Sequence, residues 1–517
     1  LSRVNDFYNF WAKTAFTIAN ADPIDLQASS VYPTELFDAI EVNAGLLLFS
    51  ASQQFLFTTD EAQLTPETAK IAFLCAYSFN EKTNPFSMGI TAGWLNSTAK
   101  RTRFHEIANI QRNGEPAVLE QSKLISKLFP DNITLPAPSV ENSMVLFATE
   151  DNNEVWGYKY YIQGSNRIQS SWFRWELPGT VTYHCMFDDV YYTVLKNDTS
   201  YTLEAYDIKK AVDTLLVGDA PQEYLVHLDT KKTVPTASLT YNTGTNKTTF
   251  TLGSGYYSSK QLEAYIIQDG STKGQTAHVE SITGTSPNQT VTLAGNWKYY
   301  EHDIATTAVN TTAETITITG HALSTAEAIT FQAGSTTISG LTDNTVYYVI
   351  KVDANTIKLA TNTSNANAGT AINLASVGAG THKIQVPTDI IIGYEFEFEV
   401  ELPTIYIQSH EGDKVKSETR GSLIVHRVNF SFGSVGLIDT TIKRKGRPDY
   451  SKSYESTEWD SYAAGTSGIV DDYIHTLPVY DRNTNLSVHL KSTHPTPATL
   501  HSVTWEGDYS GKYYKRV

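Results

Sequence analysis

Cysteine is almost absent from this chain: Cys75 and Cys185 are the only two in 517 residues. Two cysteines cannot form a disulfide framework, and neither lies in a CxxC or another metal-ligand spacing, so we expect two buried or inert thiols. Long apolar runs are missing as well. No stretch approaches the roughly 18–20 apolar residues of a membrane span, and no charged segment followed by an apolar one opens the chain. We expect no membrane span, and assembly in the compartment where the chain is made.

Basic residues are scarce relative to acidic ones. Lys and Arg number 39 against 55 Asp and Glu, which gives a formal net charge of −16. This balance argues against a protein that grips nucleic acid through its phosphates. It is compatible with a surface past which DNA slides, because an acidic wall repels phosphates. Most acidic surfaces serve only solubility, so the charge alone does not choose between these interpretations.

Motifs for metal and cofactor binding are missing too. None of the 13 histidines lies in an HExxH or HxH spacing. Such spacings are typical of metal sites. No GxSxG elbow, phosphate loop or dinucleotide fingerprint occurs. The short run Gly253-Ser254-Gly255 lacks a third glycine and the required change from strand to helix. We therefore predict no cofactor-binding and no metal-binding residue.

Adjacent reactive residues do occur, but neighbours in a strand point to opposite faces. These pairs are Asp188-Asp189, Asp471-Asp472 and His184-Cys185. Neither acidic pair therefore suits glycoside hydrolysis, which needs carboxylates that face each other across a cleft. The histidine is likewise no evident base for the neighbouring thiol. We predict no catalytic residue and do not expect an enzyme.

The composition that is present favours short strands and turns. The chain has 30 Tyr, 21 Phe and 8 Trp, with 31 Gly, 18 Pro and only 18% charged residues, and such residues favour strands separated by turns. Asp151-Asn152-Asn153 suits a hairpin turn, and a short helical stretch is expected at residues 119–128. Runs of strand length lie at residues 46–50, 54–58, 143–148, 155–162, 189–195 and 200–206.

The patterns divide the chain into several parts. Residues 1–222 form a meander of hairpins in which tryptophan recurs, which predicts β-propeller-like blades; their opening LSRVNDFYNFW resembles the middle of a strand-and-loop pattern, so we expect an upstream part to be missing. Residues 223–307 alternate Thr, Gly and Ser as in a small β-sandwich portion. Residues 308–386 predict an inserted β module and residues 387–517 a C-terminal β domain. The expected fold class is mainly β, with propeller-like blades, β-sandwich or β-barrel-like domains and the small inserted module.

A row of carboxylates stands out in the segment YEFEFEV. Strand alternation places aromatic and apolar side chains on one face and acidic ones on the other. The carboxylates then form either a solvated face or a charged edge or channel wall. The apolar set is Tyr394, Phe396, Phe398 and Val400, and the acidic set is Glu395, Glu397 and Glu399.

Two basic segments allow more than one interpretation. Residues 443–447, KRKGR, are either a solvated turn after a strand or a site for phosphate or an acidic partner. The tail at residues 512–516, KYYKR, mixes cations with aromatics. That composition suits packing against another subunit, or the tail is a frayed terminus.

Several phrases match one protein family in order. They include SRVNDFYNF at residues 2–10, ADPIDL at 21–26, LLLFSASQQFLF with TTDEAQLTPETAKI at 46–71, and VWGYKYYIQGSNRIQSSWFRWELPG at 155–179. The last third adds IGYEFEFEVELPTIYI, HRVNFSFGSVG, GRPDY, LPVYDRNTN and SVTWEGDY. Together they resemble the tail nozzle proteins (tail tubular proteins B) of short-tailed bacteriophages. Only the segment around residues 308–386 falls outside the pattern; it resembles a small β repeat inserted in many phage structural proteins.

This resemblance implies a structural protein of the virion tail that is assembled in the host cytoplasm. It implies a ring, a homohexamer, at the distal end of the tail, in contact with the tail adaptor protein and the tail fibre protein. Double-stranded DNA would pass through the lumen without specific binding, and the ring would gate its release. A cyclic ring requires a heterologous interface, in which one flank of a subunit complements the other.

Within such a protein, we expect the aromatic and arginine positions of these phrases to have ordinary structural roles. We expect the tryptophans to lie in domain cores more than at subunit interfaces, and the arginines to pair with carboxylates inside a domain or between subunits. The residues concerned are Trp156, Trp172, Trp175 and Trp505, with Arg174 and Arg427.

Two other functions stay open. A phage adhesin or glycan-binding tail protein is supported by the abundant aromatics and by the inserted module. A tail-associated glycan hydrolase is the function that the sequence supports least.

Overall fold

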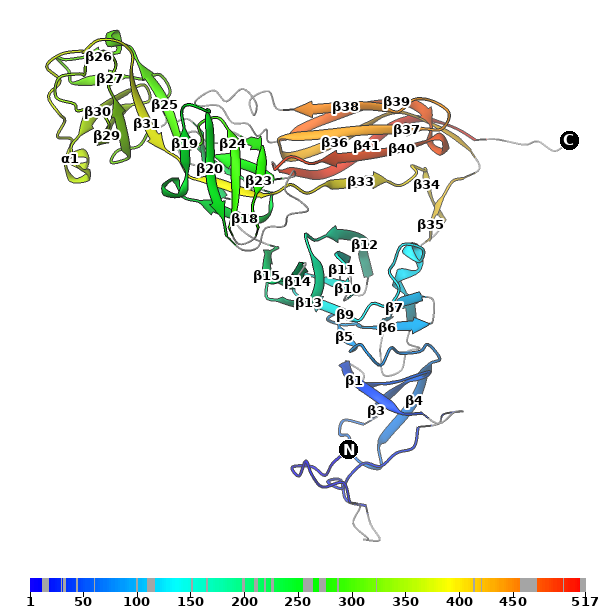
Figure 1. The fold of residues 1–517 in the computed structure, drawn as a ribbon. Coiled ribbons are helices and arrows are strands. Elements are labelled where there is room, and N and C mark those ends of the chain that lie inside the picture. The colour runs from blue at the N-terminus through cyan, green and yellow to red at the C-terminus, as the bar shows by residue number, and fades with distance from the viewer. Residues whose placement is uncertain are drawn as a thin grey trace. The chain divides into compact units, whose positions relative to one another are not determined.

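The chain folds as two compact units, Leu1–Lys210 and Ala211–Val517, coloured from blue to green and from green to red in Figure 1. The predicted mainly-β class is confirmed, since the elements are small antiparallel sheets with a few short helical turns. The computed structural model describes residues 1–11, 18–28, 30, 34–42, 45–59, 61–98, 101–108, 117–149, 152–163, 166–197, 200–208, 213–217, 220–224, 227–253, 264–268, 276–285, 288–321, 323–411, 414–419, 421–455, 472–495 and 497–511.

The Leu1–Lys210 unit is a series of hairpins that form successive antiparallel sheets. Their strand orders are β1-β2-β3-β4, β5-β6-β7-β8, β12-β11-β10-β9 and β13-β14-β15. The first two sheets contain β1 (Leu36–Val42), β2 (Gly45–Ser50), β3 (Gln54–Thr59), β4 (Ala69–Cys75), β5 (Phe86–Ser87), β6 (Ala92–Thr98), β7 (Arg101–Ala108) and β8 (Ala117–Glu120). The next two contain β9 (Leu135–Ser139), β10 (Met144–Ala148), β11 (Glu154–Gln163), β12 (Asn166–Glu176), β13 (Thr180–Phe187), β14 (Val190–Asn197) and β15 (Ser200–Asp207).

Apolar side chains fill the space between each sheet and the next. Phe49 packs near Trp94 between the first two sheets, with ring centroids 5.6 Å apart. Phe104 and Phe147 lie 5.1 Å apart between the second and third. The third core, which includes Leu146 and Leu195, joins the β9–β12 sheet to β13–β15. Burying a side chain of this size contributes about 1.5–3 kcal/mol, so each sheet is held by its neighbours.

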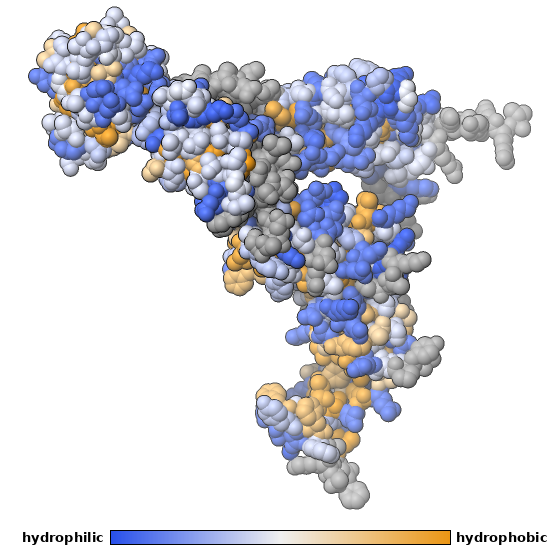
Figure 2. Space-filling view, in the orientation of Figure 1, coloured by the Kyte–Doolittle hydropathy of each residue, from blue (hydrophilic) through white to orange (hydrophobic). Residues whose placement is uncertain are grey.

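Strand alternation explains this stack, because successive residues of one strand face opposite cores. The topology suits propeller blades, but the propeller arrangement itself stays a prediction. Figure 2 shows hydrophobic residues gathered on the visible side of the β1–β4 sheet, whereas the C-terminal sheets are mostly hydrophilic.

The predicted strands of this unit are confirmed with small shifts at their ends. The six predicted runs correspond to β2, β3, β10, β11, β14 and β15. The β10–β11 hairpin is also present, with Ala148 opposite Val155; Asp151 of its predicted turn lies outside the described residues. The helical stretch predicted at residues 119–128 is wrong in part: β8 runs to Glu120, and a 3-10 turn, η1 (Gln121–Ile125), follows. The first two residues of that segment, Leu119 and Glu120, belong to β8, which pairs with β7 before the chain turns.

Gly157 on β11 lies in close contact with the ring of Phe173. A Cβ atom there would lie 2.0 Å from Cζ of Phe173, whose ring covers the glycine from β12. We expect Gly157→Ala to destabilise the unit by about 1–3 kcal/mol, because the ring must move out of a packed core. Gly244→Ala, in an exposed turn, should change stability by less than about 0.5 kcal/mol. Urea denaturation of both variants tests this, and equal effects would contradict it.

The Ala211–Val517 unit begins with a hairpin and a sandwich. β16 (Asp213–Val217) pairs with β17 (Ala220–Tyr224). The sandwich has sheets ordered β18-β32-β21-β22 and β19-β20-β24-β23 around a core that includes Val234, Phe250 and Tyr394. Its strands are β18 (Asp229–Val234), β19 (Thr240–Asn242), β20 (Lys247–Leu252), β21 (Ala264–Gln268), β22 (Thr276–His278), β23 (Ser281–Thr283), β24 (Gln289–Ala294) and β32 (Ile390–Tyr394). One strand thus comes from beyond the predicted segment 223–307.

A seven-stranded sheet, ordered β25-β31-β28-β29-β30-β27-β26, encloses its own core around Phe331 and Val349. This sheet contains the strands of the predicted module 308–386 and also β25, which precedes that segment. Its elements are β25 (Tyr299–Ile304), β26 (Val309–Asn310), β27 (Thr315–Thr317), β28 (Ala328–Gln332), β29 (Thr345–Asp353), β30 (Thr356–Ala360), α1 (Thr363–Asn367) and β31 (His382–Pro387). The predicted domain boundaries stay predictions.

The C-terminal part packs the sheet β33-β40-β37-β38 against β39-β36-β41 around Phe430 and Leu490, with the hairpin β34-β35 between β33 and β36 in sequence. Its strands are β33 (Phe398–Leu402), β34 (Gln408–Glu411), β35 (Lys414–Ser417), β36 (Ser422–Val435), β37 (Leu437–Arg444), β38 (Tyr450–Glu455), β39 (Tyr473–Arg482), β40 (Leu486–Ser492) and β41 (Ala498–Ser510).

The continuous strand predicted over residues 394–400 is wrong. Tyr394 ends β32 and is buried in the sandwich core, whereas Phe398 begins β33 of another sheet. The chain leaves one sheet and enters the next between these residues, which periodicity alone cannot reveal because the alternation continues through the junction.

Candidate functional site

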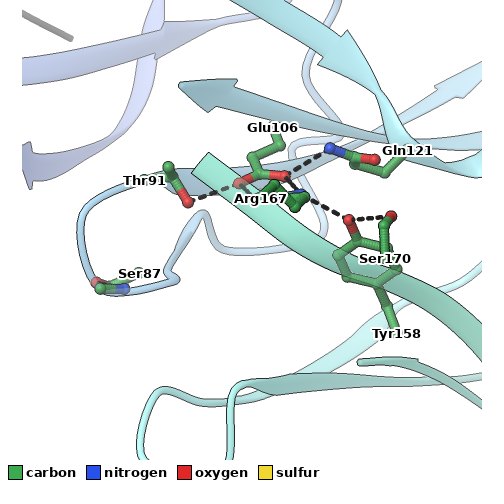
Figure 3. A network of polar contacts seen from close by, with 8 residues as sticks. Ser87, Thr91, Glu106, Gln121, Tyr158, Arg167 and Ser170 are labelled. Atoms are coloured by element: carbon green, nitrogen blue, oxygen red, sulfur yellow. Dashed lines mark hydrogen bonds and ion pairs between the residues drawn. The ribbon is translucent and has the colours of Figure 1, made fainter. Parts of the chain in front are cut away.

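A connected polar centre lies between two sheets of the Leu1–Lys210 unit. Glu106 on β7 is fully buried, and its carboxylate accepts hydrogen bonds from both terminal nitrogens of Arg167 on β12. Thr91 donates to Oε1 and Gln121 of η1 donates to Oε2, each at 2.7 Å. Figure 3 shows these groups converging on the carboxylate. The ion pair therefore joins the β5–β8 sheet to the β9–β12 sheet.

The arginine is itself held by a second residue of its own sheet. Arg167 Nη1 donates to the Tyr158 hydroxyl at 2.6 Å, and that oxygen lies 2.9 Å from Ser170 Oγ. Burial opposes the charge of Arg167, but the hydrogen bond and the charge of Glu106 outweigh it and raise the pKa of the guanidinium. Burial also raises the pKa of Tyr160, which stacks beside Tyr158, to about 12.

This arrangement occupies both oxygens of the carboxylate with hydrogen-bond donors. Each oxygen of Glu106 accepts from Arg167 and from one neutral donor, and the side chain has no access to solvent. A general acid or base must reach a substrate proton. The centre is thus suited to fixing the relative position of two sheets, because breaking a buried pair leaves an uncompensated charge.

The neighbouring His105 faces the opposite core, between the first two sheets. Its ring stacks on Tyr77 and Trp94, at centroid distances of 4.5 and 5.5 Å. Neither ring nitrogen has a hydrogen-bond partner among the described residues. Burial lowers the pKa of His105 to about 4, and the charge of Arg103 acts in the same direction. The imidazole is therefore kept neutral in the fold.

His184 and Cys185 point to opposite faces of their sheet. His184 points into the third core, 2.9 Å from the Tyr191 hydroxyl and 2.8 Å from the Leu135 carbonyl oxygen, whereas Cys185 lies opposite Tyr192 on the other face of the sheet. The prediction that they point apart is confirmed. Burial lowers the pKa of His184 to about 4.

Asp188 and Asp189 lie in the turn between β13 and β14. Asp188 has a φ of 51°, and its carbonyl oxygen accepts a hydrogen bond from Asn142; the Asp189 carbonyl oxygen accepts from Ile208 N at 2.9 Å. Asp472 has a φ of 57°, and Asp471 lies outside the described residues.

The two cysteines differ. Cys75 is buried, and burial raises the pKa of its thiol, as expected for an inert thiol. Cys185 is only half-buried, and its inertness stays a prediction.

The predicted core tryptophans pack in cores. Trp156 and Trp172 contact the second core, Trp175 the third and Trp505 the C-terminal one. The two arginines pair within their own sheets: Arg174 with Glu154 at 3.2 Å and Glu176 at 2.8 Å, and Arg427 with Glu506 at 2.6 Å.

The carboxylate row is partly neutralised from the next strand. On β33, Phe398 and Val400 contact the core while Glu399 and Glu401 point outward, so the predicted alternation holds there. Glu397 pairs with Lys491. Glu399 lies 3.1 Å and Glu401 3.8 Å from nitrogens of His489, and the hydrogen bond from His489 lowers the pKa of Glu399. Glu395 lies 3.5 Å from His278.

The basic run at residues 443–447 spans the end of β37 and the turn before β38. Lys445 donates to the Thr484 carbonyl oxygen at 2.8 Å, Arg447 lies 3.8 Å from Asp481 and Arg444 lies over the Tyr450 ring. These contacts fit the solvated turn better than a free anion site. The tail at residues 512–516 and most of Gly253-Ser254-Gly255 lie outside the described residues.

Among the described residues, no three His, Cys, Asp or Glu side chains are placed to hold a metal ion, and no helix is long and apolar enough to cross a membrane.

Sequence reasoning missed the Glu106–Arg167 pair. The sequence signal for this pair was one acidic residue, Glu106, inside the strand segment RTRFHEIA. Its neighbours His105 and Ile107 are both buried in the structure. Its partner is 61 residues away in the chain, and no spacing rule connects two such positions.

Comparison with known proteins places the chain in a family. The family model of the bacteriophage nozzle protein matches residues 1–308 and 303–516. A curated relative, the tail tubular protein gp12 of Escherichia phage T7, is 22% identical over 254 residues, which cover 47% of this chain and 31% of that protein. The match thus spans about a third of the relative's length.

Solved structures support neither a fold nor a function for this chain. An exo-β-1,3-galactanase of Phanerochaete chrysosporium with β-1,3-galactotriose aligns over 96% of this chain and 99% of that chain, with 9% identity and a TM-score of 0.19. Its complex with galactose covers 88% of this chain and 76% of that chain, with 9% identity and a TM-score of 0.17. Scores this low indicate neither a shared fold nor a shared activity.

The family model matches nearly the whole chain. This chain belongs to the bacteriophage nozzle protein family and is a structural protein of a phage tail.

Proposed function

We propose that this chain forms the distal ring of a phage tail, the nozzle around the DNA-ejection channel, and that it acts mechanically and not as an enzyme. The match of the nozzle family model along residues 1–308 and 303–516 carries the proposal. The ring is a homohexamer assembled in the host cytoplasm. It contacts the tail adaptor protein and the tail fibre protein, and shifts of its subunits gate DNA release.

The packing between the sheets of the Leu1–Lys210 unit supports a mechanical role for this chain. Apolar cores join each sheet to the next, and the Glu106–Arg167 pair adds a directional contact between two of them. Packed interiors transmit strain instead of absorbing it. A ring that stays shut against DNA under pressure needs subunits with this property.

The charge supports passage of DNA without binding. The chain carries a net charge of −16, and Glu399 and Glu401 point outward from β33, at 3.1 and 3.8 Å from nitrogens of His489. Acidic surfaces repel phosphates and give a moving duplex no attachment point. We propose such surfaces for the wall of the channel.

A glycan-binding tail protein is the second candidate. Sugar binding would favour exposed aromatic rings, but the exposed large apolar residues of the seven-stranded sheet in the described chain are Val346 and Val352. Screening the full chain against a glycan array tests this alternative, and saturable binding would support it.

Immunogold labelling of purified virions, combined with the copy number from quantitative mass spectrometry, tests the nozzle proposal. We expect label at the tail tip and about six copies per particle, as a closed sixfold ring requires. Label along projecting fibres, or no chain in the virion, would overturn it.

A further inference from the structure

A second polar site lies between the first two sheets of the Leu1–Lys210 unit, on the face of the β6–β7 hairpin that packs against β2. Trp94 on β6 stands directly opposite His105 on β7, and Asn96 follows Trp94 by two residues. By strand alternation the three side chains share one face of the hairpin. Trp94 and His105 are 0% exposed, and Asn96 is 3% exposed. Three polar side chains are thus enclosed in a core that is otherwise apolar, with Phe49 and Ile107 beside them.

Four buried polar atoms of this site have no hydrogen-bond partner among the described residues. They are Nε1 of Trp94, Oδ1 of Asn96 and both ring nitrogens of His105. The indole nitrogen is a donor, the amide oxygen is an acceptor, and a neutral imidazole supplies one donor and one acceptor. Exchanging the oxygen and nitrogen of Asn96 would place a donor there instead, and that donor would equally need a partner. The site therefore suits a ligand that both donates and accepts hydrogen bonds.

The walls of the site belong to the described chain. The His105 ring lies between the rings of Tyr77 and Trp94, at centroid distances of 4.5 and 5.5 Å, so a ligand reaches its nitrogens only at the ring edge. The Tyr77 backbone is fixed from β3, because Gln54 Nε2 donates to the Tyr77 carbonyl oxygen at 2.7 Å. Since the four polar atoms are already enclosed, chain segments outside these residues cannot reach them.

We propose that this site binds water as a permanent part of the fold, through hydrogen bonds to Trp94, Asn96 and His105. Leaving four buried polar atoms unpaired would cost free energy comparable to the net stability of a domain. A buried water with roughly two to four polar partners recovers these bonds. The inference is independent of the ring proposed above.

The chemistry of the site favours water over an ion. His105 is neutral, because burial and the charge of Arg103 lower its pKa. A cation would face the indole N–H of Trp94 and the charge of Arg103, and an anion would face the lone pairs of Asn96. An ion buried without a partner of opposite charge carries a large desolvation penalty, which a neutral molecule avoids.

A crystal structure of the full chain, at a resolution that shows ordered water, tests the proposal directly. We expect a water oxygen about 2.7–3.2 Å from Trp94 Nε1 and within the same range of Asn96 or His105. Electron density without a peak at this site would overturn the proposal.

Nuclear magnetic resonance tests the same contact in solution. The indole N–H of Trp94, assigned by its loss in Trp94→Phe, should show a nuclear Overhauser effect to long-lived water. Trp297 is the matched control, since it is also buried but donates from Nε1 to the Ala294 carbonyl oxygen at 2.8 Å. Its indole N–H should show no such effect. Equal behaviour of the two indoles would contradict the proposal.

Asn96→Leu separates a hydrated site from a dry one by the sign of its effect. If water links Asn96 to Trp94 and His105, leucine displaces it and both partners lose a hydrogen bond, so the urea midpoint falls. If Asn96 Oδ1 is unpaired, an apolar side chain of similar size removes an unmatched acceptor and the midpoint rises. A higher midpoint would therefore reject the water site. If the variant does not fold, the crystal structure and the indole signals of the wild type still decide.

Discussion

Arg167→Met should destabilise the Leu1–Lys210 unit by about 3–5 kcal/mol, the effect expected when one partner of a buried ion pair is removed. The substitution leaves Glu106 fully buried with hydrogen bonds from Thr91 and Gln121 but without its cation. Hydrogen exchange should therefore increase in β7 and β12, and the denaturant midpoint of this unit should fall.

Arg174→Met is the matched control because Arg174 lies on the same strand and also pairs with two carboxylates, but near the surface. Exposed pairs contribute about 0–1 kcal/mol. The double variant Glu106→Gln with Arg167→Met should recover part of the lost stability, since it removes the unpaired charge. If Arg167→Met and Arg174→Met cost the same, the buried pair does not hold the two sheets together.

Acid should destabilise both units in a window set by buried histidines. Burial lowers the pKa from 6.5 to about 4 at His105, His184, His302 and His475. The unfolded chain then binds protons that the folded chain excludes, so stability is complete above 6.5 and falls as the pH drops toward 4. At about pH 5 each such histidine costs about 2 kcal/mol.

His105→Phe isolates one contribution, because phenylalanine can keep the stacking on Tyr77 and Trp94 without a titrating group. Its stability relative to the wild type should increase by about 2 kcal/mol from pH 7 to pH 5. Urea denaturation followed across this pH range measures the difference. An unchanged slope of stability against pH would show that His105 does not stay neutral in the fold.

Within the Leu1–Lys210 unit, the apolar cores and the Glu106–Arg167 pair fix the sheets relative to one another.

Local features were predictable. The runs at residues 143–148 and 155–162 became β10 and β11 because alternation and turn residues act on neighbours in the chain. Phrases such as residues 155–179 likewise indicated the family without any structure.

Features that depend on residues distant in the chain were not predictable from the sequence. Glu106 and Arg167 meet only because two sheets pack face to face, and residues 394–400 divide between two sheets although their alternation is unbroken. The sequence by itself therefore determined strands, turns and family, which arise from local periodicity and motif order. The tertiary structure alone decided which charges are buried and paired, because burial is set by residues distant in the chain.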